Sequence, residues 1–334
     1  MKKIIASMIF VFVILSVFSC RHDANPSGPV ATNTPTPIAS YTDLASVPGG
    51  TFVQTDASDT TNAFTSTVSE FKMGKYEVTY DLWYMVCQWA IANGYTFQLL
   101  GAEGFNGTVG APPTAARYVP AVFMGWRDVI VWCNAYSQKT GLTPVYCLDA
   151  GFKNPIKSSI DAAYSNITDP TAGGIDNPYV NWSANGYRLP TESEYQYTAS
   201  YINGSIWTPY NYASGATAAY TNEAATELVG WFNANTGVSL TEANVGILAP
   251  NALGIYDMSG NAWGWCWDWY GPYPTTAQTN YRGIASVNPA DFPGRVFKGG
   301  CYAEIAYNLQ VGIRNFSASY GYSRDRGFRV ARSN

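Results

Sequence analysis

Histidine is almost absent from this 334-residue sequence: the chain has one, His22. A Ser-His-Asp or Cys-His catalytic site needs an imidazole as its general base, and a histidine-containing zinc site needs it as a ligand. Because His22 lies in a proline- and threonine-rich stretch near the N-terminus, neither site can be built in the folded part. Acid–base chemistry there would require carboxylates, lysine or tyrosine.

Charge is also scarce. Charged residues make up 13% of the chain, the net charge is −4, and no basic cluster occurs. Neutralising a phosphate backbone requires a patch of lysine and arginine. We therefore expect no direct nucleic-acid partner.

Beyond Cys20 there are five cysteines, and none forms a C-x-x-C pair. In an exported protein they could pair, which would leave at least one thiol free. Cys133 and Cys147 are close enough in sequence to suggest a bridge, but spacing alone does not establish one.

The N-terminus reads "MKKIIASMIFVFVILSVFSC", which is typical of a secretory signal peptide over residues 1–19. Its apolar run, 4–19, is shorter than the roughly 17–25 residues of a membrane span. Val17 to Cys20 resembles a bacterial lipobox, with Phe18 where a smaller residue is usual. We expect cleavage before Cys20, a lipid on Cys20, and a lipid-anchored protein at the bacterial surface, in the outer membrane. The alternative is an ordinary signal peptide.

Residues 20–46 are rich in proline and threonine and predict an extended tether. Residues 47–334 contain no second linker of this kind, so we expect one α+β domain. Stretches 95–120, 150–182 and 201–247 are rich in glycine, asparagine, threonine and alanine and predict long loops with sparse regular structure.

Three helices are predicted from apolar spacing and capping residues. Thr79 would cap the first, which ends at Gly94 and turns inward Leu82, Met85, Val86, Trp89 and Ala90. The second would end at Gly141 and turn inward Val129, Trp132, Cys133 and Tyr136. A short third helix would follow a strand and start at Pro190-Thr191.

Three motifs occur in an order seen in one family: "YRLPTESEYQY" (187–197), "NALGIYDMSGNAWGWCWDWY" (251–270) and "GFRVAR" (327–332). They resemble the formylglycine-generating-enzyme/sulfatase-modifying domain over roughly residues 46–332. That resemblance implies an elaborated C-type-lectin-like fold. It also suggests an oxidase that acts on a cysteine of a client protein.

The residues that would perform the oxidase chemistry differ here. The family's C-x-x-x-x-C thiol pair would fall near Glu304 and Leu309, and Cys301 stands where the family has serine. Thiolate chemistry and thiol-held copper both need two neighbouring sulfurs. We therefore expect no enzymatic activity and assign no catalytic residue.

The family's calcium loop, N-x-W-E-W, reads "GNAWGW" in this chain, so Gly264 replaces the glutamate. Losing an anionic oxygen weakens a calcium site. Asn261, Asp257 and backbone carbonyls could still hold an ion, but a packed turn is the better interpretation, and we expect no cofactor and no bound metal. Four tryptophans alternate along this stretch, and we assign them to the core and a strand face: Trp263, Trp265, Trp267 and Trp269.

A second resemblance concerns the C-terminal segment 295–332. It runs from "RVFKGGCY" to "GFRVAR", like the variable segment of proteins diversified by retroelements, and with the leader it is similar to spirochaete-type variable surface lipoproteins. Randomisation of template adenines in those systems turns asparagine codons into a set lacking Lys, Glu, Gln, Met and Trp. Residues 302–325 contain no Lys, Met or Trp, although Glu304 and Gln310 occur.

Tyrosine, serine, glycine and asparagine make up 11 of the 24 residues between 302 and 325. Such a composition suits a binding surface, because tyrosine offers a large contact area at low rotamer cost. We assign Leu309, Val311, Phe328 and Val330 to the core beneath it. The predicted ligand-binding residues are Tyr302, Ala303, Glu304, Ile305, Tyr307, Ile313, Asn315, Phe316, Ser317, Tyr320, Tyr322, Ser323, Arg324 and Asp325.

The sequence thus predicts a non-catalytic, surface-displayed receptor or adhesin, which we expect to be a monomer. Its partner would be a surface ligand, a protein or a glycan, and it would meet the membrane through the lipid alone. Two alternatives stay open: a modifying enzyme of the formylglycine-generating type, and a lectin or cell-wall-binding module that uses the tryptophan-rich region.

Overall fold

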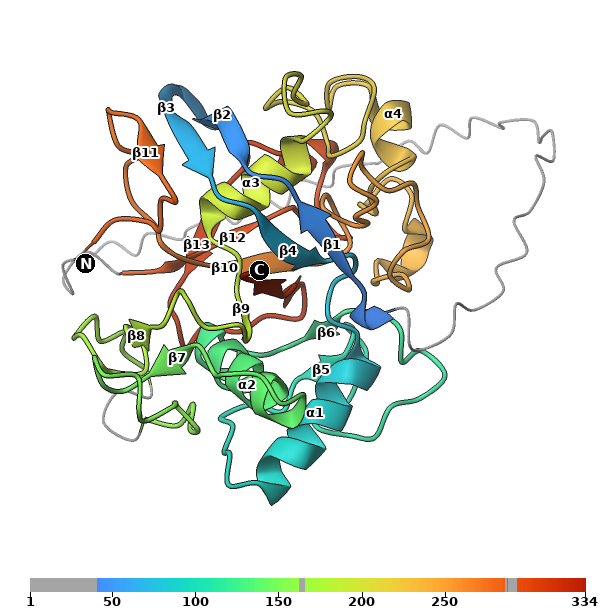
Figure 1. Ribbon diagram of the computed structural model, residues 1–334. Coiled ribbons are helices and arrows are strands. Elements are labelled where there is room, and N and C mark those ends of the chain that lie inside the picture. Colours follow the sequence, from blue (N-terminus) through green and yellow to red (C-terminus); the bar gives the residue numbers. More distant parts are fainter. Residues whose placement is uncertain (1–40, 162–165, 286, 288–292) are drawn as a thin grey trace, which may run out of the picture. The chain divides into compact units, whose positions relative to one another are not determined.

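The computed structural model describes residues 41–161, 166–285, 287 and 293–334 (Figure 1). The predicted signal peptide 1–19, the lipidation site Cys20 and most of the tether lie outside these ranges. The predicted domain start at residue 47 is late, because strand β1 (Leu44–Val47) already pairs with β4 (Phe71–Gly74). The ring of Tyr41 also stacks on Tyr118 at 4.9 Å.

The strands form small sheets, and the C-terminal segment contributes to two of them. One sheet has the order β1-β4-β15-β9, with β15 at Ala331–Arg332 and β9 at Tyr187–Arg188. The second has the order β13-β12-β10-β14, and its strands are Asn315–Ser317, Arg295–Lys298, Trp263–Trp269 and Arg326–Gly327. The last strand, β15, thus lies between β4 and β9, while β12 and β14 pair with β10 and β13 pairs with β12.

The other strands are short, except for the β2–β3 hairpin. A three-stranded sheet joins β11 (Gln278–Thr279), β3 (Asp59–Val68) and β2 (Gly50–Asp56). Two-stranded pairs join β5 (Ala102–Glu103) to β6 (Ala121–Val122), and β7 (Tyr146–Cys147) to β8 (Tyr179–Val180). Short helical turns occur at Glu223–Glu227 (α4), Gly237–Ser239 (η2) and Ala306–Leu309 (η4). The α+β prediction with sparse regular structure is confirmed.

Helix α1 spans Tyr80–Ala92, and the Thr79 side chain caps it by accepting from the amide of Leu82. Leu82, Val86 and Ala90 are buried as predicted, but the Met85 assignment is wrong, since its side chain is 46% exposed. Trp83 and Cys87 are buried instead. The buried face of α1, which packs on α2, is rotated by about one residue from the predicted face.

Helix α2 spans Trp126–Lys139, and the four side chains predicted to point inward are buried. Helix α3 spans Glu192–Ser200 and starts with the capping box that Thr191 and Glu194 form. Both predictions are confirmed. In Figure 1, α1 and α2 lie side by side, while α3 lies near the β2–β3 hairpin.

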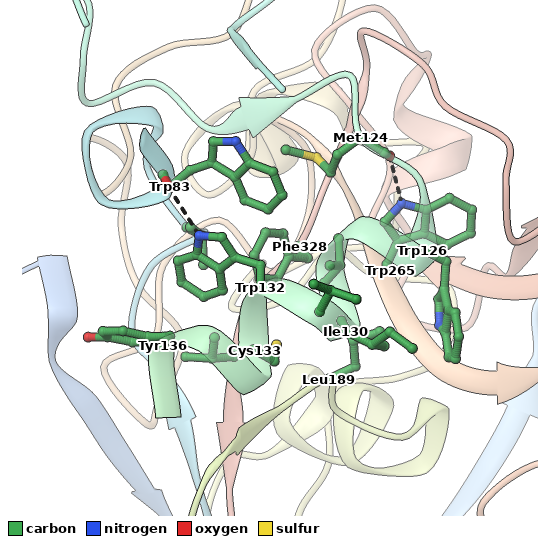
Figure 2. Packing of buried hydrophobic residues seen from close by; sticks show 14 of the residues in the cluster. Trp83, Met124, Trp126, Ile130, Trp132, Cys133, Tyr136, Leu189, Trp265 and Phe328 are labelled. Carbon is green, nitrogen blue, oxygen red and sulfur yellow. Dashed lines mark hydrogen bonds between the residues drawn. The ribbon is translucent and has the colours of Figure 1, made fainter. Parts of the chain in front are cut away.

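The core around α2 is aromatic (Figure 2). Trp83 stacks on Trp132 with ring centroids 5.7 Å apart, and Phe328 meets both rings edge-on. The Trp132 indole donates to the Trp83 carbonyl at 3.2 Å, so its polar atom is satisfied inside the core. The four tryptophans of β10 are 0–7% exposed, which confirms their assignment to the core.

The five cysteines beyond Cys20 are all buried and unbridged in the part of the chain that the structure covers. A Cys133–Cys147 disulfide is therefore not formed. Within the same residues, none of the helices combines the length and apolar character needed to span a bilayer.

Candidate ligand-binding surface

The ends of segment 295–332 are held rigidly. β12 lies between β10 and β13, β14 pairs in parallel with β10, and β15 pairs with β4 and β9. Gly299 and Gly300, just after β12, have φ values of +101° and +79°. A Cβ on Gly299 would lie 2.5 Å from the Tyr195 hydroxyl, so glycine is required there. Residues 302–325 thus lie between chain ends that are held by strand pairing.

Part of the segment packs inward. Leu309, Val311, Phe328 and Val330 are 0–6% exposed, as predicted. Two predicted ligand contacts are also buried: Tyr302 is 3% exposed and Ile313 is 4% exposed. Both belong to the core around α2, where they can support a surface but cannot touch a ligand. Their inclusion among the contact residues is corrected accordingly.

One group of predicted residues gathers on Phe123. The Tyr322 ring, 50% exposed, meets the Phe123 ring edge-on at 4.7 Å, and the Arg324 guanidinium lies 4.8 Å from the same ring. Arg324 also donates to the backbone carbonyls of Phe105 and Gly107. Phe123 has a φ of +62°, a costly conformation for a bulky side chain that is typically retained where the surroundings over-determine it.

A second group surrounds Phe316, which is 43% exposed and stacks on Tyr270 with ring centroids 4.3 Å apart. A cavity of about 380 Å³ opens beside it. Its lining residues are Asn166, Ile167, Thr168, Pro293, Phe316, Ala318 and Tyr320. Because the lining combines aromatic and aliphatic side chains with a few polar groups, the cavity can accept an apolar group from a ligand.

The remaining predicted residues are distributed around these groups. Tyr307 meets the Tyr220 ring edge-on at 5.3 Å, and its turn, η4, contacts α4. Tyr307 therefore belongs to neither the Phe123 group nor the Phe316 group. The neighbouring Glu304 accepts from Asn308 at 2.5 Å. Exposed or half-buried side chains complete the set: Ala303, Ile305, Asn315, Ser317, Ser323 and Asp325.

Several framework residues of this surface were missed from the sequence: Phe105, Phe123, Ile167, Tyr270 and Arg314. Four of them lie outside segment 295–332, so no local pattern connects them with it. Arg314 lies within it and is 8% exposed, with its guanidinium over the Tyr270 and Tyr273 rings at 4.4 and 4.2 Å. A charged residue in this segment could have been noticed in the sequence. Its position over Tyr270, which supports the Phe316–Tyr270 stack, could not.

A buried carboxyl group lies next to this surface. Glu242 is 7% exposed; one of its oxygens accepts from the Phe105 amide at 2.8 Å, and the other has no hydrogen-bond partner. Burial and the nearby charge of Asp325 raise the pKa of Glu242 to about 7. Since the pKa is higher in the folded state than in the unfolded state, this carboxyl group favours folding at low pH, and that contribution is lost as pH rises through 7.

Replacement of Glu242 by glutamine should therefore raise the free energy of unfolding at pH 8 by up to about 3 kcal/mol, since one pKa unit corresponds to 1.36 kcal/mol. At pH 4 the two proteins should be nearly equal. Urea unfolding across pH 4–8 measures this difference. A constant difference between the proteins at every pH would show that Glu242 does not titrate in this range.

Two residues other than cysteine, Glu304 and Leu309, stand at the positions of the family's thiol pair. Glu304 is half-buried and Leu309 is fully buried, while Cys301 is 1% exposed. Burial raises the pKa of the Cys301 thiol, which disfavours the reactive thiolate.

In the loop that aligns with the family's calcium loop, Asn261 is hydrogen-bonded within the protein, while one oxygen of Asp257, Oδ1, is buried without a hydrogen-bond partner. Asn261 donates to Glu77 at 2.7 Å and accepts from the Ala243 amide at 3.0 Å, and Asp257 accepts from Gly246 at 2.7 Å. Gly264 lies within β10, paired with Lys298. Across the described ranges, no three histidine, cysteine or acidic residues are grouped as metal ligands would be.

Residues 30–334 match the family model described as "Sulfatase-modifying factor enzyme 1-like domain". The chain belongs to this family. The formylglycine-generating enzyme of Streptomyces coelicolor is 30% identical over 162 residues, which cover 46% of this chain and 48% of that enzyme. A Paenibacillus barcinonensis protein named chaperone protein LppX is 29% identical over 308 residues, 87% of this chain and 89% of that protein.

Among solved structures, Treponema denticola variable protein 1 superposes with a TM-score of 0.64 and 27% identity, covering 87% of this chain and 95% of that one. CarF superposes with a TM-score of 0.62 and 21% identity, which shows the shared fold. The fold is thus the C-type-lectin-like fold of the sulfatase-modifying family, and the resemblance to a variable protein is confirmed.

Proposed function

We propose that this member of the sulfatase-modifying family is a non-catalytic ligand-binding protein, whose C-terminal segment forms a diversified binding site. One observation carries the proposal: the ends of segment 295–332 are fixed in two sheets, while aromatic side chains between them are exposed. Phe316 and Tyr322 are 43% and 50% exposed, more than most aromatic side chains in the described residues. A fixed scaffold allows such side chains to change without unfolding the protein.

Binding would use Phe316, Tyr320 and Tyr322 as anchors. Each lies against a framework group. Tyr270 stacks on Phe316, the Arg127 guanidinium lies near the Tyr320 ring, and Phe123 meets the Tyr322 ring edge-on. The pre-set ring positions reduce the entropy that is lost when a ligand binds. Arg324 and Asp325 would add charge at the edge of the surface.

The setting of the site is part of the proposal. A lipid on Cys20 would anchor the mature chain at the outer face of the bacterial outer membrane, and the proline- and threonine-rich stretch after it would act as a tether. The protein would work as a monomer without a cofactor. Its partner would be a protein or glycan on another surface. Mass spectrometry of the membrane-extracted protein tests the anchor, since Cys20→Ser should abolish the lipid-modified N-terminal peptide.

The test of diversification is the DNA that flanks the gene. We expect a near-copy of the codons for 295–332 whose mismatches fall at adenines, beside a reverse-transcriptase gene. The mismatched codons would identify the variable residues directly. Absence of both elements would make 302–325 a fixed loop and contradict the proposal.

Two rival functions have direct tests. A modifying enzyme of the formylglycine-generating type is favoured by the identity to the Streptomyces enzyme, and it would produce an aldehyde on a cysteine-containing peptide. We expect no aldehyde, because Glu304 and Leu309 occupy the thiol positions. A lectin that uses Trp263 or Trp267 would have to expose rings that are 2% and 7% accessible.

Replacement of Tyr320 or Tyr322 by alanine should weaken ligand binding by roughly 1–4 kcal/mol each, if both are central anchors. Titration calorimetry with a ligand recovered by cross-linking on the cell surface measures the loss. Tyr210→Ala is the matched control, because Tyr210 is 39% exposed and lies outside the segment. Native-like folding with unchanged affinity in both tyrosine variants would remove them from the site.

A further inference from the structure

A separate cavity of about 250 Å³ lies among framework residues. It is lined by the turn between β3 and β4, by Arg188 and the start of α3, and by four positions elsewhere in the sequence: Trp182, Asn280, Arg282 and Ser333. No residue of 302–325 lines it. Its volume is several times the roughly 30 Å³ that one water molecule occupies in the liquid, so it has room for a small organic group.

Two arginines lie over one aromatic ring in this cavity. The guanidinium of Arg282 is 4.0 Å from the centre of the Trp182 ring, and that of Arg188 is 5.3 Å from it. The ring is itself held in place, because Trp267 meets it edge-on at 5.8 Å and the Ser333 hydroxyl donates to the Trp182 carbonyl. Arg282 is therefore held by stacking on Trp182.

The charges of the two arginines are balanced differently. Both terminal nitrogens of Arg188 bind the Glu194 carboxylate at 2.7 Å, while its Nε is buried without a hydrogen-bond partner. Arg282 has no ion pair with any residue that the structure describes. Burial and the charge of Arg188 lower the pKa of Arg282, and Glu194 only partly opposes them. Two arginines and two glutamates line the cavity, and Glu194 is already paired with Arg188. The exposed Arg282 guanidinium is therefore the cation that an incoming anion can reach.

The wall that carries Arg282 is firmly attached. β11 pairs in parallel with β3, and the Asn280 amide continues this pairing to the Thr67 carbonyl at 2.8 Å. The Asn280 side chain accepts from the Ser69 amide at 2.8 Å and donates to the Ser69 hydroxyl at 2.9 Å. Arg282 follows two residues later, so its backbone position is set by these contacts, independently of any ligand.

We propose that this cavity binds the carboxylate of a small organic acid, with the Arg282 guanidinium as its main donor. A planar guanidinium matches a carboxylate through two parallel hydrogen bonds. Glu70 and Glu194 also line the cavity, and their charges disfavour a doubly charged sulfate or phosphate. The site does not depend on the function proposed for segment 295–332.

The test uses NMR of the ¹⁵N-labelled folded protein, observed at the arginine Nε–H groups. Sodium acetate and sodium benzoate are titrated against sodium chloride at equal ionic strength. One arginine resonance, absent from Arg282→Gln, should shift and saturate with the carboxylates but not with chloride. The dissociation constant for benzoate from calorimetry should rise at least roughly tenfold in Arg282→Gln. Arg117→Gln should behave like the wild type, because the half-buried Arg117 pairs with Asp81 outside the cavity.

Equal benzoate affinity in Arg282→Gln and wild type would overturn the proposal, as would the absence of saturation. Stronger binding of sulfate or phosphate than of carboxylate would overturn the assigned ligand class. If Arg282→Gln fails to fold, Arg282→Lys keeps the charge but removes the planar fork, and should still weaken carboxylate binding. Tyr320→Ala and Tyr322→Ala should leave benzoate binding unchanged, which separates this site from the surface of the C-terminal segment.

Discussion

Replacing Asp176 by asparagine is expected to lower the free energy of unfolding by about 3–5 kcal/mol, the usual cost of breaking a buried ion pair by removing one partner. The Asp176 carboxylate binds Nε and Nη2 of Arg127 at 2.6 Å each, and the two side chains are 0% and 1% exposed. Asp176 also accepts from the Ser319 hydroxyl and from the Asp169 amide. Its loss would leave the charge of Arg127 without this carboxylate in the protein interior.

The same substitution should disturb the proposed binding surface, because the Tyr320 ring lies 5.7 Å from the Arg127 guanidinium. Urea unfolding measures the stability change. Asp43→Asn is the matched control, since the Lys75–Asp43 pair is 35% and 50% exposed and should contribute about 0–1 kcal/mol. A cost below about 1 kcal/mol for Asp176→Asn would show that the buried pair is not a principal support of the segment.

Replacing Glu192 by glutamine should have a comparable effect, again about 3–5 kcal/mol. Glu192 is 1% exposed; it pairs with Arg314 at 2.8 Å, lies 3.8 Å from Lys298, and accepts from the Tyr273 hydroxyl at 2.6 Å. One carboxylate therefore serves two buried cations. Because Lys298 is in β12 and Arg314 immediately precedes β13, the two cations hold the start and the middle of the C-terminal segment above α3.

Arg314→Gln should cost less than Glu192→Gln, because Glu192 would still be near Lys298 and Tyr273. Burial already lowers the pKa of Lys298, and removal of Glu192 should lower it further. A lowered folded-state pKa means that the unfolded state binds more protons, so the penalty of Glu192→Gln should shrink as pH rises from 7 towards about 10.4. Denaturant unfolding of both variants at pH 7 and pH 9.5 tests this. A penalty that grows with pH would contradict the assignment.

Local rules predicted the regular elements well. The Thr79 cap, the capping box of Thr191 and Glu194 and the inward face of α2 depend on residues within a few positions of one another, so they can be recognised in the sequence. The alternating tryptophans of β10 were recognisable for the same reason. Met85 was misassigned because the spacing of α1 allowed more than one apolar face, and only its packing against α2 selected between them.

The candidate binding surface could be predicted only in part. Composition and flanking motifs identified segment 302–325, and they correctly separated Leu309, Val311, Phe328 and Val330 as core. They could not separate Tyr302 and Ile313 from the exposed residues, because the segment follows no strand or helix period. Its burial is set by distant contacts, such as the bond from the Tyr302 amide to the Asn261 carbonyl.

The sequence by itself determined the fold class, the three helices, the position of the C-terminal segment and the absence of histidine from the folded part. Residue type and short-range spacing are sufficient for these features. Only the tertiary structure decided which aromatic rings reach the surface and which framework residues support them. Phe123, Ile167 and Tyr270 come from loops far apart in sequence, and the pairing of β12 and β14 with β10 and of β15 with β4 and β9 places the segment beside them. Short-range sequence patterns cannot predict such long-range contacts.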